Sequence, residues 1–356
     1  MPRVNLLGLF LGLGLSLGLG LGLGLGESVA PNFLSVGDWG SAALGGYHLR
    51  NAQDTSSAMK AYITEKTRLG QDPPMFVLNT GDNFYYCGIQ NTSDPQISED
   101  YTALFGGMGL TWYHSLGNHD YGFSPEAQLA LNTTIPGWIM DARYYYRRVS
   151  VSSSIIVNII VLDTNPCVRD YRGIDRRRWD PCGTQYPDCS PIAEPCRFHD
   201  NIIAQDCDAQ LEWAKTVLAS IPSNHTEWVF VVGHHKAEEI DAADFQSAFL
   251  DDPRIHLYLN GHTHNLEHYE INGQAKYMTT GAGGMVMIGG EGEGGGAERL
   301  SPHHHHHQSN HTVKSLWSKV VTGFTSHTFM NDGTAMRTEF WDAKKNETVY
   351  SFDVHL

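Results

Sequence analysis

Five short apolar runs of this chain each end at a glycine, and a polar or imidazole side chain follows each glycine within one to four residues. Each run has the length and composition of a buried β-strand, and the glycine lets the chain turn sharply after it. Such a pattern predicts an α/β layered domain with a site along one sheet edge. The runs and their turns are Phe33–Val36 before Gly37-Asp38-Trp39-Gly40, Met75–Thr80 before Gly81-Asp82-Asn83-Phe84-Tyr85, Trp112–Leu116 before Gly117-Asn118-His119-Asp120, Trp228–Val232 before Gly233-His234-His235, and Ile255–Asn260 before Gly261-His262-Thr263-His264.

The side chains in these turns suit metal binding when they are taken together. A single Gly-Asp turn is usually a cap, and a tyrosine beside Phe84 is usually part of a core. Carboxylates, a phenolate, an amide oxygen and imidazoles as one set instead favour a pair of borderline-hard metal ions over a lone structural zinc. We therefore predict a metal site with seven ligands: Asp38, Asp82, Tyr85, Asn118, His234, His262 and His264.

The composition of the chain limits the kinds of molecule that it can bind. The chain has 356 residues, is 41% hydrophobic and carries a net charge of -15, from 39 acidic against 24 basic residues. That balance repels a phosphate backbone and disfavours a general nucleic-acid binder. A small phosphorylated substrate or a phosphoprotein remains compatible, because bound metal ions would invert the local field.

The N-terminal segment has the pattern of a secretory signal. Arg3 precedes a Leu/Gly run from Leu6 to Gly26, and Ser28-Val29-Ala30 supplies the small residues of a cleavage site. We expect residues 1–30 to be removed, which leaves no stable membrane span. A retained anchor is the alternative, because the run is about long enough to cross a bilayer. Sequons for glycosylation also fit a secreted glycoprotein, and they start at Asn91, Asn132, Asn224, Asn310 and Asn346.

From residue 31 onward, strands and helices alternate as in one domain, residues 31–356. Helical periodicity covers Asp54–Leu69 and Asp208–Ser220, with Asp208 as a possible cap, and Phe245 and Phe249 indicate another helix. The β-branched run Ile155–Leu162 predicts a central strand. Near the C-terminus, alternation predicts strands at Thr338–Trp341 and Thr348–Val354.

Two stretches break this alternation. Residues 167–207 are rich in Pro, Asp and Arg and hold five of the six cysteines, so we expect a long surface loop stapled by disulfides. If all six cysteines are oxidised within the monomer, Cys87 must pair with one of those five; a free Cys87 is the alternative. Residues 289–311 are of low complexity and include His303–His307, which we expect to be solvated and not a metal site.

The five turns, in this order, resemble the purple acid phosphatases of the calcineurin-like metallophosphoesterase superfamily, in the small mammalian, tartrate-resistant form. The tyrosine at position 85 is the distinguishing mark. The resemblance implies a four-layer αββα sandwich as a single catalytic domain. It also implies a secreted or lysosomal/vacuolar acid phosphatase that cleaves phosphate monoesters with metal-bound hydroxide. By that match, Fe(III) is held by Asp38, Asp82, Tyr85 and His264. A divalent ion (Fe, Zn or Mn) is held by Asn118, His234 and His262, with Asp82 as the bridge.

Two further histidines are candidates for catalysis. His119 resembles a family histidine that contacts the phosphate or protonates the leaving group, and His235 is expected to face the substrate. Asp120 is expected to orient His119 or to cap the next turn. The family often has a proline two residues after the Gly-His ligand and a second substrate-facing histidine further along the chain. Here Lys236–Glu239 follows and no histidine occurs before His256, so the loop beside the leaving group differs. A phosphodiesterase or nucleotide pyrophosphatase, or a metal-binding surface glycoprotein without turnover, are the alternatives.

Overall fold

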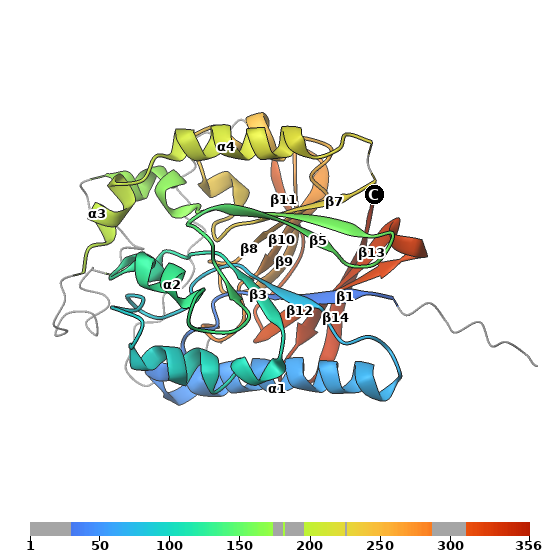
Figure 1. Ribbon diagram of the computed structural model, residues 1–356, viewed down its shortest axis with the longest axis horizontal. Helices are drawn as coiled ribbons and strands as arrows, with labels where there is room; N and C mark the ends of the chain where they lie inside the picture. Colours follow the sequence, from blue (N-terminus) through green and yellow to red (C-terminus); the bar gives the residue numbers. More distant parts are fainter. Residues whose placement is uncertain (1–29, 174–180, 182–195, 225, 287–310) are drawn as a thin grey trace, which may run out of the picture.

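Two seven-stranded β-sheets packed face to face form the centre of the structure (Figure 1). The structure is a computed structural model, and it describes residues 30–173, 181, 196–224, 226–286 and 311–356. The first sheet, sheet A, contains in spatial order β14 (Glu347–His355), β13 (Ala335–Asp342), β12 (Gly323–Met330), β1 (Asn32–Val36), β2 (Phe76–Asn79), β3 (Thr111–His114) and β4 (Trp138–Ile139).

The second sheet, sheet B, repeats this plan of a parallel centre with antiparallel additions. It contains β11 (Val313–Lys319), β9 (Leu266–Ile271), β10 (Gln274–Thr280), β8 (Leu257–Asn260), β7 (Trp228–Val232), β6 (Ile156–Val161) and β5 (Tyr145–Ser150). In sheet A the strands β1, β2 and β3 are parallel, and in sheet B β6, β7 and β8 are parallel. All five apolar runs of the sequence therefore end at the carboxyl edge of a parallel strand, as predicted.

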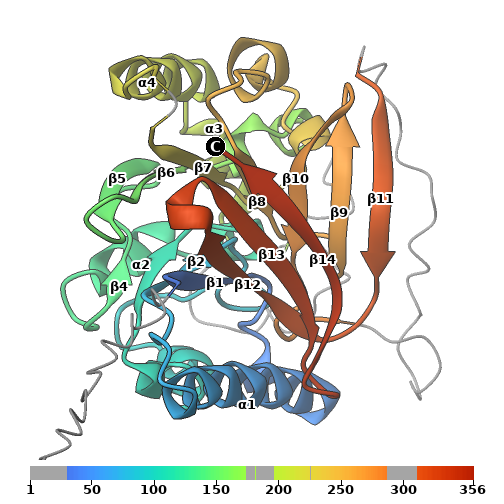
Figure 2. The same ribbon diagram turned by 90° about the vertical axis from the view of Figure 1, so that its right-hand side faces the viewer.

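Helices cover the outer face of each sheet, which confirms the αββα sandwich. Figures 1 and 2 show α1 beneath sheet A and α4 above sheet B. The α-helices are α1 (Gly46–Arg68), α2 (Pro125–Leu131), α3 (Phe198–Ile203) and α4 (Cys207–Ser220). Short 3-10 helices are η1 (Ala42–Leu44), η3 (Gly106–Met108), η4 (His119–Tyr121), η5 (Asn165–Cys167), η6 (Arg169–Arg172), η8 (Ala237–Glu239) and η10 (Asn331–Gly333), and η2 (Ile97–Thr102) and η9 (Gln246–Leu250) are π-helical.

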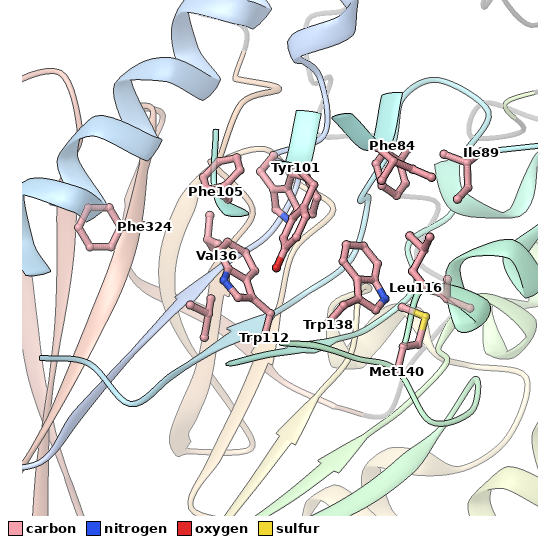
Figure 3. Close-up of a cluster of buried hydrophobic side chains, with 14 of the residues drawn as sticks. Val36, Phe84, Ile89, Tyr101, Phe105, Trp112, Leu116, Trp138, Met140 and Phe324 are labelled. Carbon is pink, nitrogen blue, oxygen red and sulfur yellow. The ribbon is translucent and has the colours of Figure 1, made fainter. Parts of the chain in front are cut away.

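Three apolar clusters hold the layers together. Phe33 of sheet A and Phe230 of sheet B lie in the cluster between the two sheets. A second cluster fills the space between sheet A and α1, and Figure 3 shows Val36, Trp112 and Phe324 within it. The third joins α4 to the outer face of sheet B. Each cluster buries one face of a sheet, so the strand ends that carry the polar turns are held in fixed relative positions.

Several predicted elements differ from the structure in their bounds. Helix α1 begins at Gly46 and not at Asp54, because its first two turns bury polar side chains, including Asn51, that break the apolar periodicity. Helix α4 begins at Cys207, and its cap is Asp206, whose carboxylate accepts the Ala209 N–H, so Asp208 is not the cap. The helix expected around Phe249 is the single π-turn η9. The two C-terminal strands are confirmed as β13 and β14.

The cysteines are oxidised in the described part of the chain. Cys167 and Cys207 form a disulfide that closes the base of the 167–207 segment. Cys87 is also disulfide-bonded, so the prediction of a bonded Cys87 is confirmed, and the five other cysteines all lie within that segment.

The predicted signal peptide, apart from Ala30, and the tract His303–His307 lie outside the described residues. The domain boundary after residue 30 therefore stays a prediction. Among the helices that are described, none is long and apolar enough to cross a membrane.

Candidate metal centre

The seven predicted ligands lie where the carboxyl edges of the two sheets meet. Sheet A supplies Asp38 after β1, Asp82 and Tyr85 after β2, and Asn118 after β3. Sheet B supplies His234 after β7, and His262 and His264 after β8. Neither sheet carries the whole set, so the site exists only because the two sheets are packed against each other.

Three of these side chains form one group around the Tyr85 hydroxyl. Its oxygen lies 3.1 Å from Asp38 Oδ1 and 2.8 Å from Asp82 Oδ2. The same oxygen lies 3.2 Å from His264 Nε2, which is also 3.3 Å from Asp38 Oδ1. A phenol, two carboxylates and an imidazole therefore converge on one point, as the sequence predicts for the first metal ion.

The other three side chains form a second group around the Asn118 amide oxygen. Asn118 Oδ1 lies 3.1 Å from His234 Nε2 and 3.2 Å from His262 Nδ1. Asp82 joins the groups, because its Oδ2 faces Tyr85 while its Oδ1 lies 3.4 Å from His234 Nε2. This is the placement that a bridging carboxylate requires.

The backbone is bent sharply at four of the ligands. Asp38, Asp82, His262 and His264 have φ values of 56, 53, 73 and 53°, which are uncommon for residues other than glycine. Close approach explains the glycine at position 117, because a Cβ there would lie 2.1 Å from Asp82 Oδ1. Strained backbone held at a cluster of polar groups is typical of functional sites.

The charges of the buried side chains in this site favour the binding of a cation. Burial, followed by the Asp38 and Asp82 carboxylates, raises the pKa of Tyr85 well above its ordinary value. Burial opposes the charged form of Asp82, but His234 and His119 lower its pKa well below the usual range. Buried anionic oxygens in such close contact are costly unless a positive charge is added. A hard cation beside Tyr85 would supply that charge and favour the phenolate, so the donor set fits the implied metal.

A hydrogen bond also orients His234 for metal binding. Its Nδ1–H donates to the Thr80 carbonyl over 2.8 Å, so Nε2 is the nitrogen directed at Asp82 and Asn118. This arrangement, in which the second ring nitrogen donates to a carbonyl, is the usual support of a metal-binding histidine.

His119 lies beside Tyr85. Its Nδ1 donates to the Tyr86 carbonyl over 2.6 Å, its backbone N–H donates to Asp82 Oδ1 over 3.0 Å, and its ring centroid is 4.4 Å from that of Tyr85. Burial lowers the pKa of His119. The imidazole is therefore next to the first metal group, and its catalytic role stays a prediction.

His235 is deeply buried, with 1% of its surface exposed. Its Nδ1 lies 2.9 Å from Thr164 Oγ1 and its Nε2 lies 2.9 Å from the Tyr171 hydroxyl. A ligand atom of His235 also lies within 4.8 Å of ligand atoms of His234 and His262. The expectation that His235 faces the substrate stays a prediction, while its hydrogen bonds connect it to the protein.

Three residues support the ligands through contacts that the sequence does not predict. The Asp120 carboxylate accepts the N–H groups of Gly117, Asn83 and Phe84, so it joins two ligand turns. Its expected role in orienting His119 stays a prediction. Thr164 and Tyr171 contact His235 from outside all five motifs. A hydroxyl has no pattern of its own in a sequence, so the contacts of these two residues with His235 are not predicted.

Comparison with known proteins agrees with this geometry. The family model of the calcineurin-like phosphoesterases matches residues 31–266. The chain belongs to that family. Purple acid phosphatase 7 of Arabidopsis thaliana is 29% identical over 72% of this chain and 71% of its own length. Tartrate-resistant acid phosphatase type 5 of Mus musculus is 28% identical over 71% of this chain and 72% of its own length.

A solved structure gives the same fold. The purple acid phosphatase PPD1 from yellow lupin seeds matches 92% of this chain with a TM-score of 0.52 at 13% identity. The chain spans about half of that protein, since 54% of it is covered. Together with the named relatives, this match confirms the resemblance that the five motifs indicate.

Proposed function

We propose that this chain is a purple acid phosphatase that hydrolyses phosphate monoesters at a dinuclear Fe(III)–M(II) centre. Asp38, Tyr85 and His264 would hold the ferric ion, and Asn118, His234 and His262 the divalent one, with Asp82 between them. The single observation that carries the proposal is the position of the Tyr85 oxygen, within hydrogen-bond distance of Asp38, Asp82 and His264. Iron, zinc and manganese all accept the amide and imidazole donors of the second group.

Each part of the site has a distinct task in this proposal. The seven side chains would hold two cations, which would supply the positive charge that binds a phosphate and lowers the pKa of water. The bent turns hold the carboxylates and imidazoles before substrate arrives, which reduces reorganisation during the reaction. His119 would contact the phosphate or protonate the leaving group. Small phosphorylated compounds or phosphoproteins are the substrates that this chemistry fits.

We further propose that the protein acts outside the cytosol, as a secreted or lysosomal/vacuolar glycoprotein. The disulfide Cys167–Cys207 supports this, because disulfides persist in oxidising compartments. The sequon residues Asn91, Asn224 and Asn346 are exposed and can accept a glycan. A shift in electrophoretic mobility after glycosidase treatment of protein from the native host would support this proposal.

The colour of the purified protein tests the ferric site. A phenolate bound to Fe(III) gives a visible charge-transfer band, so we expect a pink to purple protein and a colourless Tyr85→Phe variant. Metal analysis and rates on a monoester and a bis-ester should accompany the spectrum. A colourless wild type with full activity would show that the site holds a divalent ion in place of the ferric ion. A strong preference for the bis-ester would overturn the monoesterase assignment.

A further inference from the structure

His235 is surrounded by hydrogen bonds although it is adjacent to a proposed ligand. Thr164 Oγ1 lies 2.9 Å from its Nδ1, and the Tyr171 hydroxyl lies 2.9 Å from its Nε2. The Tyr258 hydroxyl donates to the His235 carbonyl over 2.6 Å. Both ring nitrogens are therefore in contact with protein groups, in a side chain that is almost wholly buried.

The hydroxyl of Thr164 also holds the backbone of the ligand turn. The N–H groups of His234 and His235 both lie 3.2 Å from Thr164 Oγ1. The contact is tight, because a Cβ on Gly233 would lie 2.7 Å from Thr164 Cγ2. One side chain thus fixes the turn that directs His234 at Asn118 and Asp82.

Counting donors and acceptors fixes the direction of these hydrogen bonds. A hydroxyl has two acceptor lone pairs and one hydrogen. The two backbone N–H groups occupy the lone pairs of Thr164, so its hydrogen is donated to Nδ1 of His235. Nδ1 is then an acceptor, and the ring proton is on Nε2, which donates to the Tyr171 oxygen. An imidazolium would bring a third N–H to Thr164, which has no lone pair for it.

Tyr171 belongs to the cysteine-rich segment, so this chain of hydrogen bonds connects that segment to the ligand turn. Tyr171 lies on η6, and its ring packs against Phe198 of α3, at a centroid distance of 5.1 Å. The disulfide Cys167–Cys207 closes the segment on both sides of these two residues. Gln210 of α4 exchanges two hydrogen bonds of 2.8 Å with the backbone of Asp163, next to Thr164.

We propose that Thr164, His235 and Tyr171 form a support that positions the His234 ligand, so that occupancy of the divalent site depends on the first turns of the cysteine-rich segment. In this role His235 is a positioning residue, which replaces the expectation that it faces the substrate, because both of its ring nitrogens contact protein groups. The inference rests on the proposed dinuclear centre. Changes to such outer hydrogen bonds of metal ligands typically weaken metal binding about 10- to 100-fold.

Isosteric substitutions test this support. Thr164→Val keeps the shape and removes the hydroxyl, so we expect its affinity for the divalent ion to fall about 10- to 100-fold. The tyrosinate colour should persist, because the hydroxyl supports only the His234 side of the centre. Thr164→Ser should restore the divalent ion to wild-type levels. Tyr171→Phe should weaken the same ion without loss of colour, because Nε2–H of His235 loses its acceptor.

Matched controls separate this effect from a general loss of stability. Thr216→Val removes an exposed hydroxyl on α4 that donates to the Glu212 carbonyl of the same helix. Tyr146→Phe removes a hydroxyl that bonds Asn158 on sheet B. Metal content, the visible spectrum and the thermal unfolding midpoint should be measured for all five variants, and both controls should keep two metal ions.

The outcomes distinguish the support from the proposed function. If wild-type protein binds two metal ions and Thr164→Val and Tyr171→Phe bind the divalent ion with unchanged affinity, the support is wrong while the centre stands. If Thr164→Val loses the colour together with the divalent ion, its role is general to the fold and the inference is also overturned. If Thr164→Val does not fold, the affinity of Tyr171→Phe for the divalent ion tests the support alone, and an unchanged affinity overturns it. A wild type that binds no metal would instead contradict the proposed function.

Discussion

At the scale of single residues, Asp82 is the side chain that joins the two groups of proposed ligands. Its two oxygens face different groups, with Tyr85 on one side and His234 on the other. The backbone N–H of His119 donates to the same carboxylate. Removal of its charge should therefore affect both metal ions, whereas loss of Asn118 should affect only one.

We expect Asp82→Asn to bleach the colour and to lower the affinity for both ions by at least about 100-fold. Loss of an outer hydrogen bond costs up to about 100-fold, and loss of a direct ligand should cost at least as much. Asn118→Ala should lose the divalent ion and keep the colour, because the Tyr85 group stays intact. Titration of each apo variant with Fe(III) and with Zn²⁺ measures both effects. Wild-type metal content in Asp82→Asn would exclude the bridging role.

At this scale the sequence predicts which side chains gather at the sheet edge, but it does not predict the residues that support them. Asp38, Asp82 and the histidines follow buried strands, so strand ends and glycines are enough to place them on one edge. Thr164 is found only in the structure, because its role comes from a turn on a different strand 70 residues away. The same holds for Tyr171, whose partner His235 is 64 residues away.

At the scale of elements, the glycines between strand and ligand set how closely two turns can approach. A Cβ at position 261 would lie 2.3 Å from Asp38 Oδ2, which accepts the His262 N–H over 3.1 Å. The φ of Gly261 is not in the left-handed region, so close packing explains this glycine and backbone conformation does not. The turn after β8 is therefore fitted against the turn after β1.

Gly261→Ala should displace the Asp38 carboxylate and weaken the ferric site. We expect a shifted or bleached charge-transfer band and a loss of stability of about 1–3 kcal/mol, the usual cost of overpacking. Gly107→Ala is the matched control, because no atom lies within 4 Å of a Cβ there. An unchanged spectrum and unfolding midpoint in Gly261→Ala would show that the two turns can move apart freely.

Element boundaries were the weaker part of the sequence prediction, for a physical reason. Strands buried on both faces are continuous apolar runs, so β1, β2, β7 and β8 are all predicted. Strand β3 is predicted as well, although only Trp112 and His114 of it are buried. Helix α1 instead starts with buried polar residues, among them Asn51, whose amide donates to the Gly284 and Val286 carbonyls. The spacing of apolar residues does not indicate such a turn, although the turn belongs to the helix.

At the scale of the whole molecule, buried carboxyl groups couple folding to pH. Burial raises the pKa of Asp100, Asp120 and Glu238 to about 7 in each case. At these three groups, the folded chain then binds more protons than the unfolded chain between about pH 4 and pH 7. The stability that these three groups contribute is therefore fully present below that window and is lost as the pH rises through it. Buried histidines act in the opposite direction, because burial lowers the pKa of His48 to about 4 and that of His327 to about 3, so their protonation at low pH destabilises the fold.

Asp100 offers the cleanest test, because it lies outside the metal centre, on η2. Its Oδ1 accepts the Ala43 N–H over 2.6 Å, while Oδ2 is buried with no partner among the described residues. Asp100→Asn keeps the acceptor and cannot ionise. A shift from 3.8 to about 7 corresponds to a cost on the order of 4 kcal/mol above that window. We therefore expect the variant to be more stable than wild type at pH 8, and the difference to shrink at pH 4. Urea unfolding at both pH values measures the effect, with the exposed Asp208→Asn as control, and an equal pH slope for Asp100→Asn and wild type would show that Asp100 ionises in the folded protein at no cost.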